Sequence, residues 1–187
     1  MTPITRLLVI LIALATCPVQ ARDRPFVDEP SQERDDIEEG TPWQERDFTL
    51  PPYPDDADLL EFPVDDGDSR LRYFVDARHL KVGTDGVVHY TLVVKSASGA
   101  PNVSVEGIRC DQNQFKTYAF GTGRGTLKPV KAPRWERIGG PGQSPHYRDL
   151  REFFFCRQDR YAPQEKEDIV RLLGSTPRRG DDQGFLP

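Results

Sequence analysis

The sequence predicts an α+β fold: a small antiparallel β-sheet of four to five strands, a C-terminal helix packed on one face, and one disulfide. Three observations support this prediction. Stretches in which apolar and polar residues alternate follow one another between residues 59 and 121, a helical stretch comes after them, and one cysteine lies in each region. Strands that precede a helix in the chain are typical of α+β domains, and we expect this one to span residues 53–160.

Residues 1–21 predict a secretory signal peptide. An uninterrupted apolar run, 7–15, precedes Val19 and Ala21, small residues at the −3 and −1 positions of a cleavage site. This run is too short for a transmembrane anchor, which needs about 20 residues. The alternative is a lipoprotein acylated at Cys17, because LATC loosely resembles a lipoprotein cleavage box. We expect the mature chain in the periplasm or the outer envelope.

An acidic arm, residues 22–52, follows the predicted leader. Residues 22–58 hold 13 Asp and Glu against 4 Arg, a balance of −9, whereas residues 59–187 hold 17 acidic and 20 basic residues, a balance of +3. Because the arm is highly charged and has few large apolar side chains, we expect it to be disordered. It is either a solubilising spacer or a segment that shields the more basic body.

The strands begin after a Pro-rich entry at 51–54. LLEFPV fits an edge strand, and LRYFVDA alternates with the two-residue period of a strand. LKVGTDGVVHYTLVVKS predicts a hairpin, because Gly83 and Gly86 flank a two-residue reversal. The next strand, 102–110, loses its alternation at Gly107, which predicts a bulge, and FKTYAFG continues the sheet.

A loop rich in Gly, Pro and basic residues, 121–143, separates the strands from the helix. SPHYRDLREFFFC predicts that helix, with Ser144 as the N-cap. Its apolar side chains recur at helical spacing, namely Tyr147, Leu150 and Phe154. Beyond the domain, residues 161–187 are expected to form a short helix, PQEKEDIVRLLG, and a disordered tail.

Two cysteines remain after the leader, Cys110 at the end of a strand and Cys156 after three phenylalanines. Two cysteines in an exported chain favour a disulfide, and the alternative is a pair of free thiols. None of the three histidines lies at zinc spacing from a cysteine. The sequence therefore predicts no metal site and no cofactor, and a covalent bond that fastens the helix to the sheet.

Several stretches carry a resemblance: ADLLEFPV, YFVDARHLKVGTDGVVHYTLVVKSASGAPNVSVEGIRC, YAFG with the later RWERI, and FFFC. Together they resemble the CNP-like family, named after a cryptic neisserial protein. The resemblance covers residues 53–157 and includes both cysteines. It implies an exported proteobacterial protein of unknown function and names no activity.

Motifs for catalysis are weak throughout the sequence. It contains no GxSxG nucleophile elbow, and a turn capped by its own aspartate explains Asp76 beside His79. DDGDS, which begins at Asp65, lacks the distal glutamate of a calcium loop. GTGRG, 121–125, is not followed by a helix, as a phosphate-binding loop would be. We therefore expect a protein that is not an enzyme and has no catalytic residue.

The most informative charge pattern lies in residues 109–160, which hold 11 Lys and Arg against 5 Asp and Glu, a balance of +6. Cations that alternate with aromatic side chains bind anionic polymers. The candidate binding residues are Lys131, Arg134, Trp135 and Arg137. The alternative is a solvated face that the acidic arm partly neutralises.

These patterns predict a non-enzymatic binding or structural module of the periplasm or cell surface. Its partner is unknown, and we expect an envelope protein or an anionic envelope polymer or lipid. Nucleic acid is excluded as a partner by export. The alternative function is a cell-wall enzyme or a lysozyme-type inhibitor.

Overall fold

The computed structural model describes residues 42–65, 70–157 and 161–175. The predicted signal peptide with Cys17, the arm up to residue 41, most of DDGDS, and the tail from residue 176 lie outside the described residues. The chain divides after Pro42, and the fold described below belongs to the unit that begins at Trp43.

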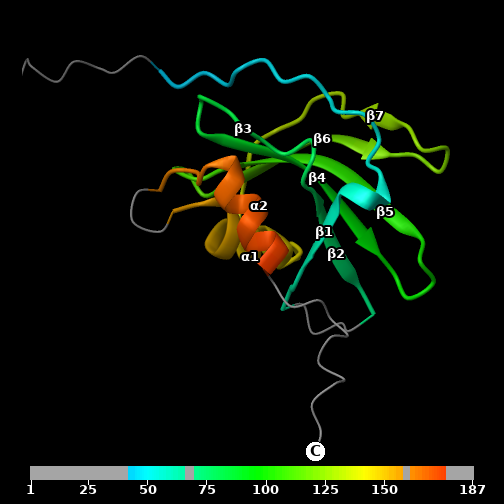
Figure 1. Ribbon diagram of the computed structural model, residues 1–187. Coiled ribbons are helices and arrows are strands. Elements are labelled where there is room, and N and C mark those ends of the chain that lie inside the picture. Colours follow the sequence, from blue (N-terminus) through cyan, green and yellow to red (C-terminus); the bar gives the residue numbers. More distant parts are fainter. Residues whose placement is uncertain (1–41, 66–69, 158–160, 176–187) are drawn as a thin grey trace, which may run out of the picture. The chain divides into compact units, whose positions relative to one another are not determined.

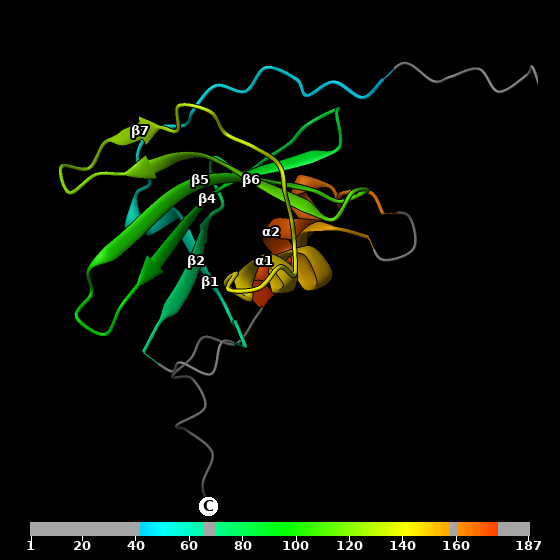
Figure 2. The same cartoon turned by 180° about the vertical axis from the view of Figure 1, so that it is seen from behind.

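This unit is an antiparallel sheet with its helices on one face (Figures 1 and 2). The strands follow the order β1-β2-β4-β5-β6-β7, while β3 pairs with β4 and β8 pairs with β6. In chain order the elements are η1 (Asp56–Asp58), β1 (Leu59–Phe62), β2 (Arg72–Asp76), β3 (Lys81–Val82), β4 (Val87–Lys95), β5 (Pro101–Arg109), β6 (Gln114–Gly121), β7 (Leu127–Pro129), β8 (Glu136–Arg137), α1 (His146–Asp149), η2 (Leu150–Phe155) and α2 (Lys166–Ser175).

The α+β class, the antiparallel pairing and the C-terminal helix are confirmed, but the predicted number of strands is wrong. The described residues form eight strands instead of four to five. Nothing in the sequence indicated β7 and β8, whereas β3 is the short first arm of the predicted hairpin; each of the three has two or three residues. β7 and β8 form inside the Gly- and Pro-rich segment because β6 offers an open edge, which pairs with β7 at one end and β8 at the other. Strands of two or three residues are too short to show an alternation of apolar and polar residues.

The main core lies between the sheet and the helices, on what we call the helix face. Its largest fully buried side chains include Phe62, Tyr90, Ile108 and Phe155. The second helix, α2, contributes Ile169 and Leu173 to the same cluster, and each is at most 1% exposed. The packed body therefore continues past residue 160 into α2.

The helix before Cys156 begins as α1 and continues as η2, a π-helix. Ser144 does not cap the backbone as predicted, because its Oγ lies 2.7 Å from Nδ1 of His146 instead. The N–H of Cys156 donates to the carbonyl of Arg151, five residues earlier, at 3.1 Å. Within this π-helical segment Phe154 and Phe155 are buried, whereas Phe153 before them is exposed.

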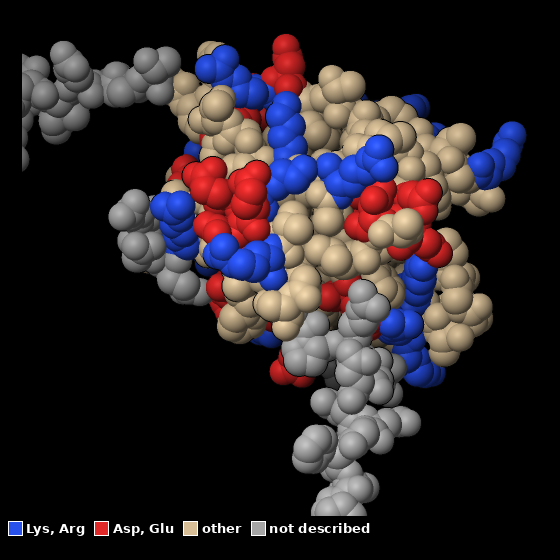
Figure 3. Space-filling model, viewed as in Figure 1, with Lys and Arg blue, Asp and Glu red and all other residues tan. Residues whose placement is uncertain are grey.

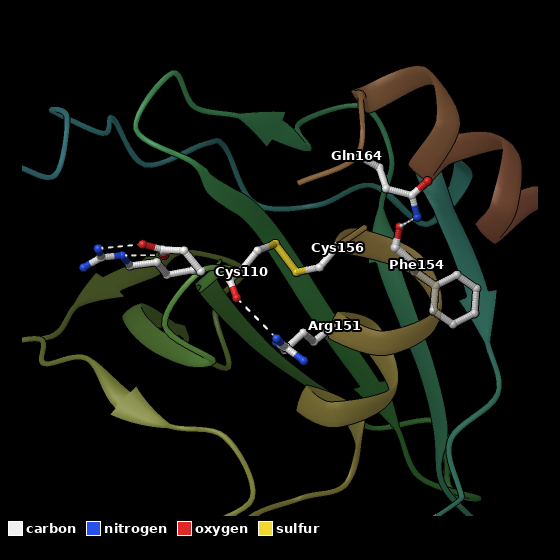
Figure 4. Close-up of a disulfide and its surroundings, with 7 residues drawn as sticks. Cys110, Arg151, Phe154, Cys156 and Gln164 are labelled. Atoms are coloured by element: carbon white, nitrogen blue, oxygen red, sulfur yellow. Dashed lines mark hydrogen bonds and ion pairs between the residues drawn. A yellow bond between two sulfur atoms is a disulfide. The ribbon is translucent and has the colours of Figure 1, made fainter. Parts of the chain in front are cut away.

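The predicted disulfide is confirmed: Cys110 and Cys156 are bonded, with their Cα atoms 5.6 Å apart (Figure 4). The bond joins the end of β5 to the end of η2. Arg151 donates to the carbonyl of Cys110 at 3.3 Å, and the side chain of Gln164 donates to the carbonyl of Phe154 at 2.9 Å (Figure 4). The junction between sheet and helix is therefore held by one covalent bond and by polar contacts on either side.

The predicted bulge at Gly107 is wrong, because β5 pairs with β4 without interruption. The irregularity lies between β5 and β6, opposite Val105 and Glu106. Apolar and polar residues do not alternate along β5 because both faces of the sheet are covered there. Val105 and Ile108 point to opposite faces, and both are buried. Gly107 provides space instead, since a Cβ there would lie 2.9 Å from the hydroxyl of Tyr118.

Candidate functional site

The edge of the sheet beyond β6 is the candidate binding surface. Its chain segment runs from the end of β6 through β7 and β8 toward α1 (Figure 2). It carries five exposed cations that make no ion pair with any carboxylate in the described part of the chain. We call them the β6-edge cations: Arg124, Lys128, Lys131, Arg134 and Arg137.

Other cations of the predicted basic segment are engaged within the protein. Each has a carboxylate within 4.0 Å, in the pairs Arg109–Asp111, Lys116–Glu45, Arg148–Asp149 and Arg157–Glu165. On the face seen in Figure 3, basic and acidic side chains are likewise interleaved. The structure thus divides the +6 segment into cations that stabilise the fold and cations that remain available at the β6 edge.

Trp135, one of the four predicted binding residues, is half-buried and is not an open platform. Its indole N–H donates to Glu45 at 3.3 Å, and its ring meets that of Trp43 edge-on, with the centroids 6.0 Å apart. The ammonium of Lys116 lies 5.3 Å from the Trp135 ring. Trp135 therefore anchors the loop, while the other three candidates, Lys131, Arg134 and Arg137, are exposed around it.

Two of these contacts, Trp43 and Glu45, belong to residues 43–48, which we call the strap; it runs along the sheet (Figure 1). The indole of Trp43 donates to the carbonyl of Asp85, and the N–H of Arg46 donates to its carboxylate, each at 2.8 Å. The guanidinium of Arg109 lies 3.6 Å from the Trp43 ring centroid. These contacts place the strap in the folded body, although the sequence assigned it to the disordered arm.

Glu45 is the central residue of the strap. Its carboxylate accepts hydrogen bonds from Lys116 at 2.5 Å, from Tyr118 at 2.7 Å and from Trp135. Partial burial alone would raise the pKa of Glu45, but these donors hold it below its usual value, so the carboxylate is ionised at neutral pH. Burial and the same carboxylate raise the pKa of Tyr118, which keeps its proton.

Phe48, the last residue of the strap, covers a buried histidine. Its ring stacks on His89 with the centroids 4.1 Å apart, and Tyr118 lies against both rings. His89 is 3% exposed, and neither ring nitrogen has a hydrogen-bond partner among the described residues. Burial lowers its pKa to about 4, against the opposing attraction of Asp85 and Glu45. His89 is therefore neutral at neutral pH.

A second polar cluster surrounds Glu106 on the helix face, and the sequence patterns did not predict it. Glu106 is 2% exposed; it accepts hydrogen bonds from Tyr90 and Ser104, each at 2.7 Å, and from Tyr147 at 3.2 Å. Nε2 of His146 lies 3.8 Å from its Oε2. Burial would raise the pKa of Glu106, but His146 and the hydroxyls hold it below its usual value. The inward position of Glu106 between Ser104 and Ile108 could have revealed it.

Two other motifs have the local structures that the sequence suggested. Asp76 accepts backbone N–H groups from Arg78 and His79, and its second oxygen lies 2.8 Å from Nδ1 of His79, which makes a capped turn. GTGRG forms the reversal between β6 and β7. Within residues 42–65, 70–157 and 161–175, no three His, Cys, Asp or Glu side chains are grouped so that they could hold a metal ion.

A family model described as the CNP1-like family matches residues 38–174. The match includes the strap, every strand, both cysteines and nearly all of α2. No curated protein and no solved structure matches the chain. None of the helices in the described residues is long and apolar enough to span a bilayer.

Proposed function

The chain belongs to the CNP1-like family, and from this premise we propose that it is an exported, non-enzymatic binding module of the bacterial cell envelope. Its ligand is an envelope surface that displays phosphate groups, and its binding surface is the set of β6-edge cations. The family resemblance seen in the sequence is confirmed by the family match. The location and the ligand are the proposal.

One observation carries the proposal: five exposed cations without carboxylate partners follow one another along one sheet edge, whereas the neighbouring cations are paired. An unpaired guanidinium keeps its fork of donors free for phosphate oxygens. Each cation near an anionic membrane contributes about 1 kcal/mol. Five of them acting together are sufficient for stable attachment.

A purely structural role for these cations fits less well. Charged side chains on an edge strand prevent pairing with a second sheet. However, only Lys128 and Arg137 lie in strands, whereas Arg124, Lys131 and Arg134 lie in the connecting loops. Loop cations protect no strand edge, so binding explains the whole set better.

Co-sedimentation with envelope material tests this function. The oxidised mature protein is mixed with phosphatidylglycerol vesicles, phosphatidylcholine vesicles or purified wall sacculi, and the bound fraction is measured. Arg134→Glu/Arg137→Glu reverses two of the five charges, so we expect at least about 30-fold weaker binding to the phosphate-bearing surface. Comparing vesicles with sacculi tells whether the phosphate belongs to lipid or to wall polymer.

Lys81→Glu/Arg171→Glu is the matched control. It makes the same change in net charge, and both residues are exposed on β3 and α2, away from the β6 edge. We expect it to bind like the wild type at moderate salt. If the wild type and both variants are retained equally, the β6-edge cations do not mediate binding to the envelope surface.

Export and attachment are tested separately by the intact mass of the protein purified from its native host. We expect a chain that begins at Arg22, produced by cleavage after Ala21. An acylated Cys17 would instead establish the lipoprotein alternative. A mass that retains Met1 would contradict export.

A further inference from the structure

An apolar cleft on the helix face is not used by the proposed function. The helices lie over one end of this face, and the hairpin that joins β4 to β5 extends beyond them (Figures 1 and 2). The cleft lies between this extension and the start of α1, and its volume is about 290 Å³. Its apolar walls include Leu71, Leu92, Val94 and Phe120. The volume is near the lower limit for ligand pockets and suits a single hydrocarbon chain.

The strand register places a cation beside this cleft. Leu92 pairs with Ser104 of β5, and Ser104 pairs with Phe120 of β6. Phe120 in turn pairs with Lys128 of β7, one of the β6-edge cations. Residues directly opposite each other in antiparallel strands point to the same face, with Cβ atoms about 4.5–5.5 Å apart. Lys128 therefore lies on the same face as the cleft and borders its rim.

Phe120 forms the rim that joins the cleft to the cations. Its side chain is 54% exposed, although it lines an apolar wall. Lys128 next to it is exposed and has no carboxylate partner in the described part of the chain. An apolar patch that charged residues border is typical of a surface that meets a membrane or a partner. The cleft and the cations thus form one continuous amphipathic surface.

The end of the cleft nearest α1 determines how an anionic ligand would lie. Glu106 lines this end. Its carboxylate already accepts hydrogen bonds from the hydroxyls of Tyr90, Ser104 and Tyr147, so it needs no ligand group. Its negative charge repels an anion. An anionic head group is therefore directed to the opposite end of the cleft, where Lys128 lies.

We propose that the cleft holds one acyl chain of an anionic phospholipid whose phosphate group lies on Lys128. This inference rests on the proposed function, since the β6-edge cations bind the phosphate, and it names lipid as the bearer of that phosphate. A wall polymer has no hydrocarbon chain to fill the cleft. A second copy of this chain fits less well, because a two-fold contact would bring two sets of these cations together.

Soluble probes test whether chain and phosphate are bound together. The oxidised protein is titrated with octyl phosphate, octanol or methyl phosphate, each below the concentration at which it forms micelles. The readout is the methyl NMR shifts of Leu92 and Val94, which line the cleft. We expect saturable shifts with octyl phosphate and about fivefold weaker binding of octanol, which lacks the charge. Methyl phosphate, which lacks the chain, should leave these methyl groups unshifted.

Two variants separate the chain from the head group. Phe120→Thr removes the ring at the rim and should weaken the binding of octyl phosphate and of octanol, each about fivefold. Lys128→Gln should weaken octyl phosphate about fivefold and leave octanol unchanged. The matched controls are Phe153→Thr, an exposed phenylalanine of η2 outside the cleft, and Lys81→Gln on β3. Both controls should bind like the wild type, and all four variants change exposed side chains and should fold.

Several results would overturn the proposal. Shifts of the cleft methyl groups that do not saturate with octyl phosphate, or equal affinities of Phe120→Thr and Phe153→Thr, would mean that no chain lies in the cleft. Equal affinity for octyl phosphate and octanol would mean that the phosphate is not recognised. A dimer in sedimentation that Phe120→Thr dissociates would assign the cleft to a second copy of this chain.

The vesicle and sacculus experiment separates this inference from the function on which it rests. Retention by sacculi alone, lost in Arg134→Glu/Arg137→Glu, would overturn the lipid inference and keep the proposed function. Saturable binding of octyl phosphate without retention by vesicles or sacculi would overturn the attachment to an envelope surface. The cleft would then remain a site for a single lipid molecule.

Discussion

The two faces of the sheet are closed by different means. On the helix face, α1, η2 and α2 cover a large apolar core, and the Cys110–Cys156 bond fastens η2 to β5. On the opposite face, the strap covers His89 and Tyr118 through ring stacking and through the hydrogen bonds of Glu45, with no covalent bond. We call this second side the strap face.

Because the two faces are closed by different interactions, they respond to different changes in solution conditions. A covalently closed face resists heat and proteases but responds to reduction, whereas a face closed by a short segment opens locally and responds to charge. The strap also holds Trp135 and therefore the loop that carries Arg134 and Arg137. We infer that the helix face provides most of the stability and that the strap face positions the binding surface.

Removing the disulfide is expected to have the largest effect. The bond closes a loop with a sequence separation of 46, so Cys110→Ala/Cys156→Ala should lower the free energy of unfolding by about 4 kcal/mol. Denaturant unfolding of wild type and variant under non-reducing conditions measures this. A loss below about 1 kcal/mol would show that the helices are held by packing alone.

Acid should weaken the strap face by a slightly smaller amount. His89 has a pKa of about 4 in the folded protein, and about 6.5 is usual in an unfolded chain. Between these values the unfolded state binds more protons, so stability falls as the pH drops, by about 3 kcal/mol in total. Below pH 4 the loss attributable to His89 is complete.

His89→Phe keeps the stacked ring and removes the titration. The free energy of unfolding of the wild type should therefore fall relative to that of the variant between pH 6.5 and pH 4, with no difference in slope above that range. Both proteins are compared by denaturant unfolding at each pH. Parallel curves across the whole range would contradict a buried, neutral His89.

Removing the charge of Glu45 should have a smaller effect, because the residue is partly exposed. Glu45→Gln weakens its charge-assisted bonds to Lys116 and Tyr118 and should favour opening of the strap by about 1–2 kcal/mol. Trypsin cleavage after Arg46 measures this opening and should become about tenfold faster. Glu167→Gln, an exposed residue of α2 far from Arg46 in the sequence, is the control and should leave the rate unchanged.

The smallest effect is expected at the β6 edge. Arg134→Glu/Arg137→Glu alters exposed side chains without described ion-pair partners, so the free energy of unfolding should change by less than about 0.5 kcal/mol. Thermal unfolding measures it. A loss above about 2 kcal/mol would mean that these cations support the fold, and the weaker binding expected of this variant would then have another cause.

Much of the fold was readable in the sequence, because the signals were local. The hairpin at Gly83 and Gly86, the long strands β4 and β5 and the helical spacing after Ser144 all predicted the observed elements. The pairing of Cys110 with Cys156 followed from the small number of cysteines. The family resemblance, confirmed by the family match, rested on the same stretches.

The rest depended on contacts between distant residues. Nothing in the acidic composition of the arm distinguished the strap, since Glu45 acquires its role only when Lys116 and Trp135 approach it. Likewise β7 and β8 exist because β6 has an open edge. The basic segment predicted a binding region, but only the structure separated its paired cations from its free ones.

Hydrogen exchange measured by mass spectrometry most directly tests the independent closure of the two faces. One sample is reduced at neutral pH and another is brought oxidised to pH 4, with intrinsic rates corrected. We predict that reduction deprotects residues 146–157 while the backbone N–H of Arg46, which donates to Asp85, stays protected, and that acid deprotects this N–H while the helices stay protected. Simultaneous opening of both segments under both conditions would contradict the account.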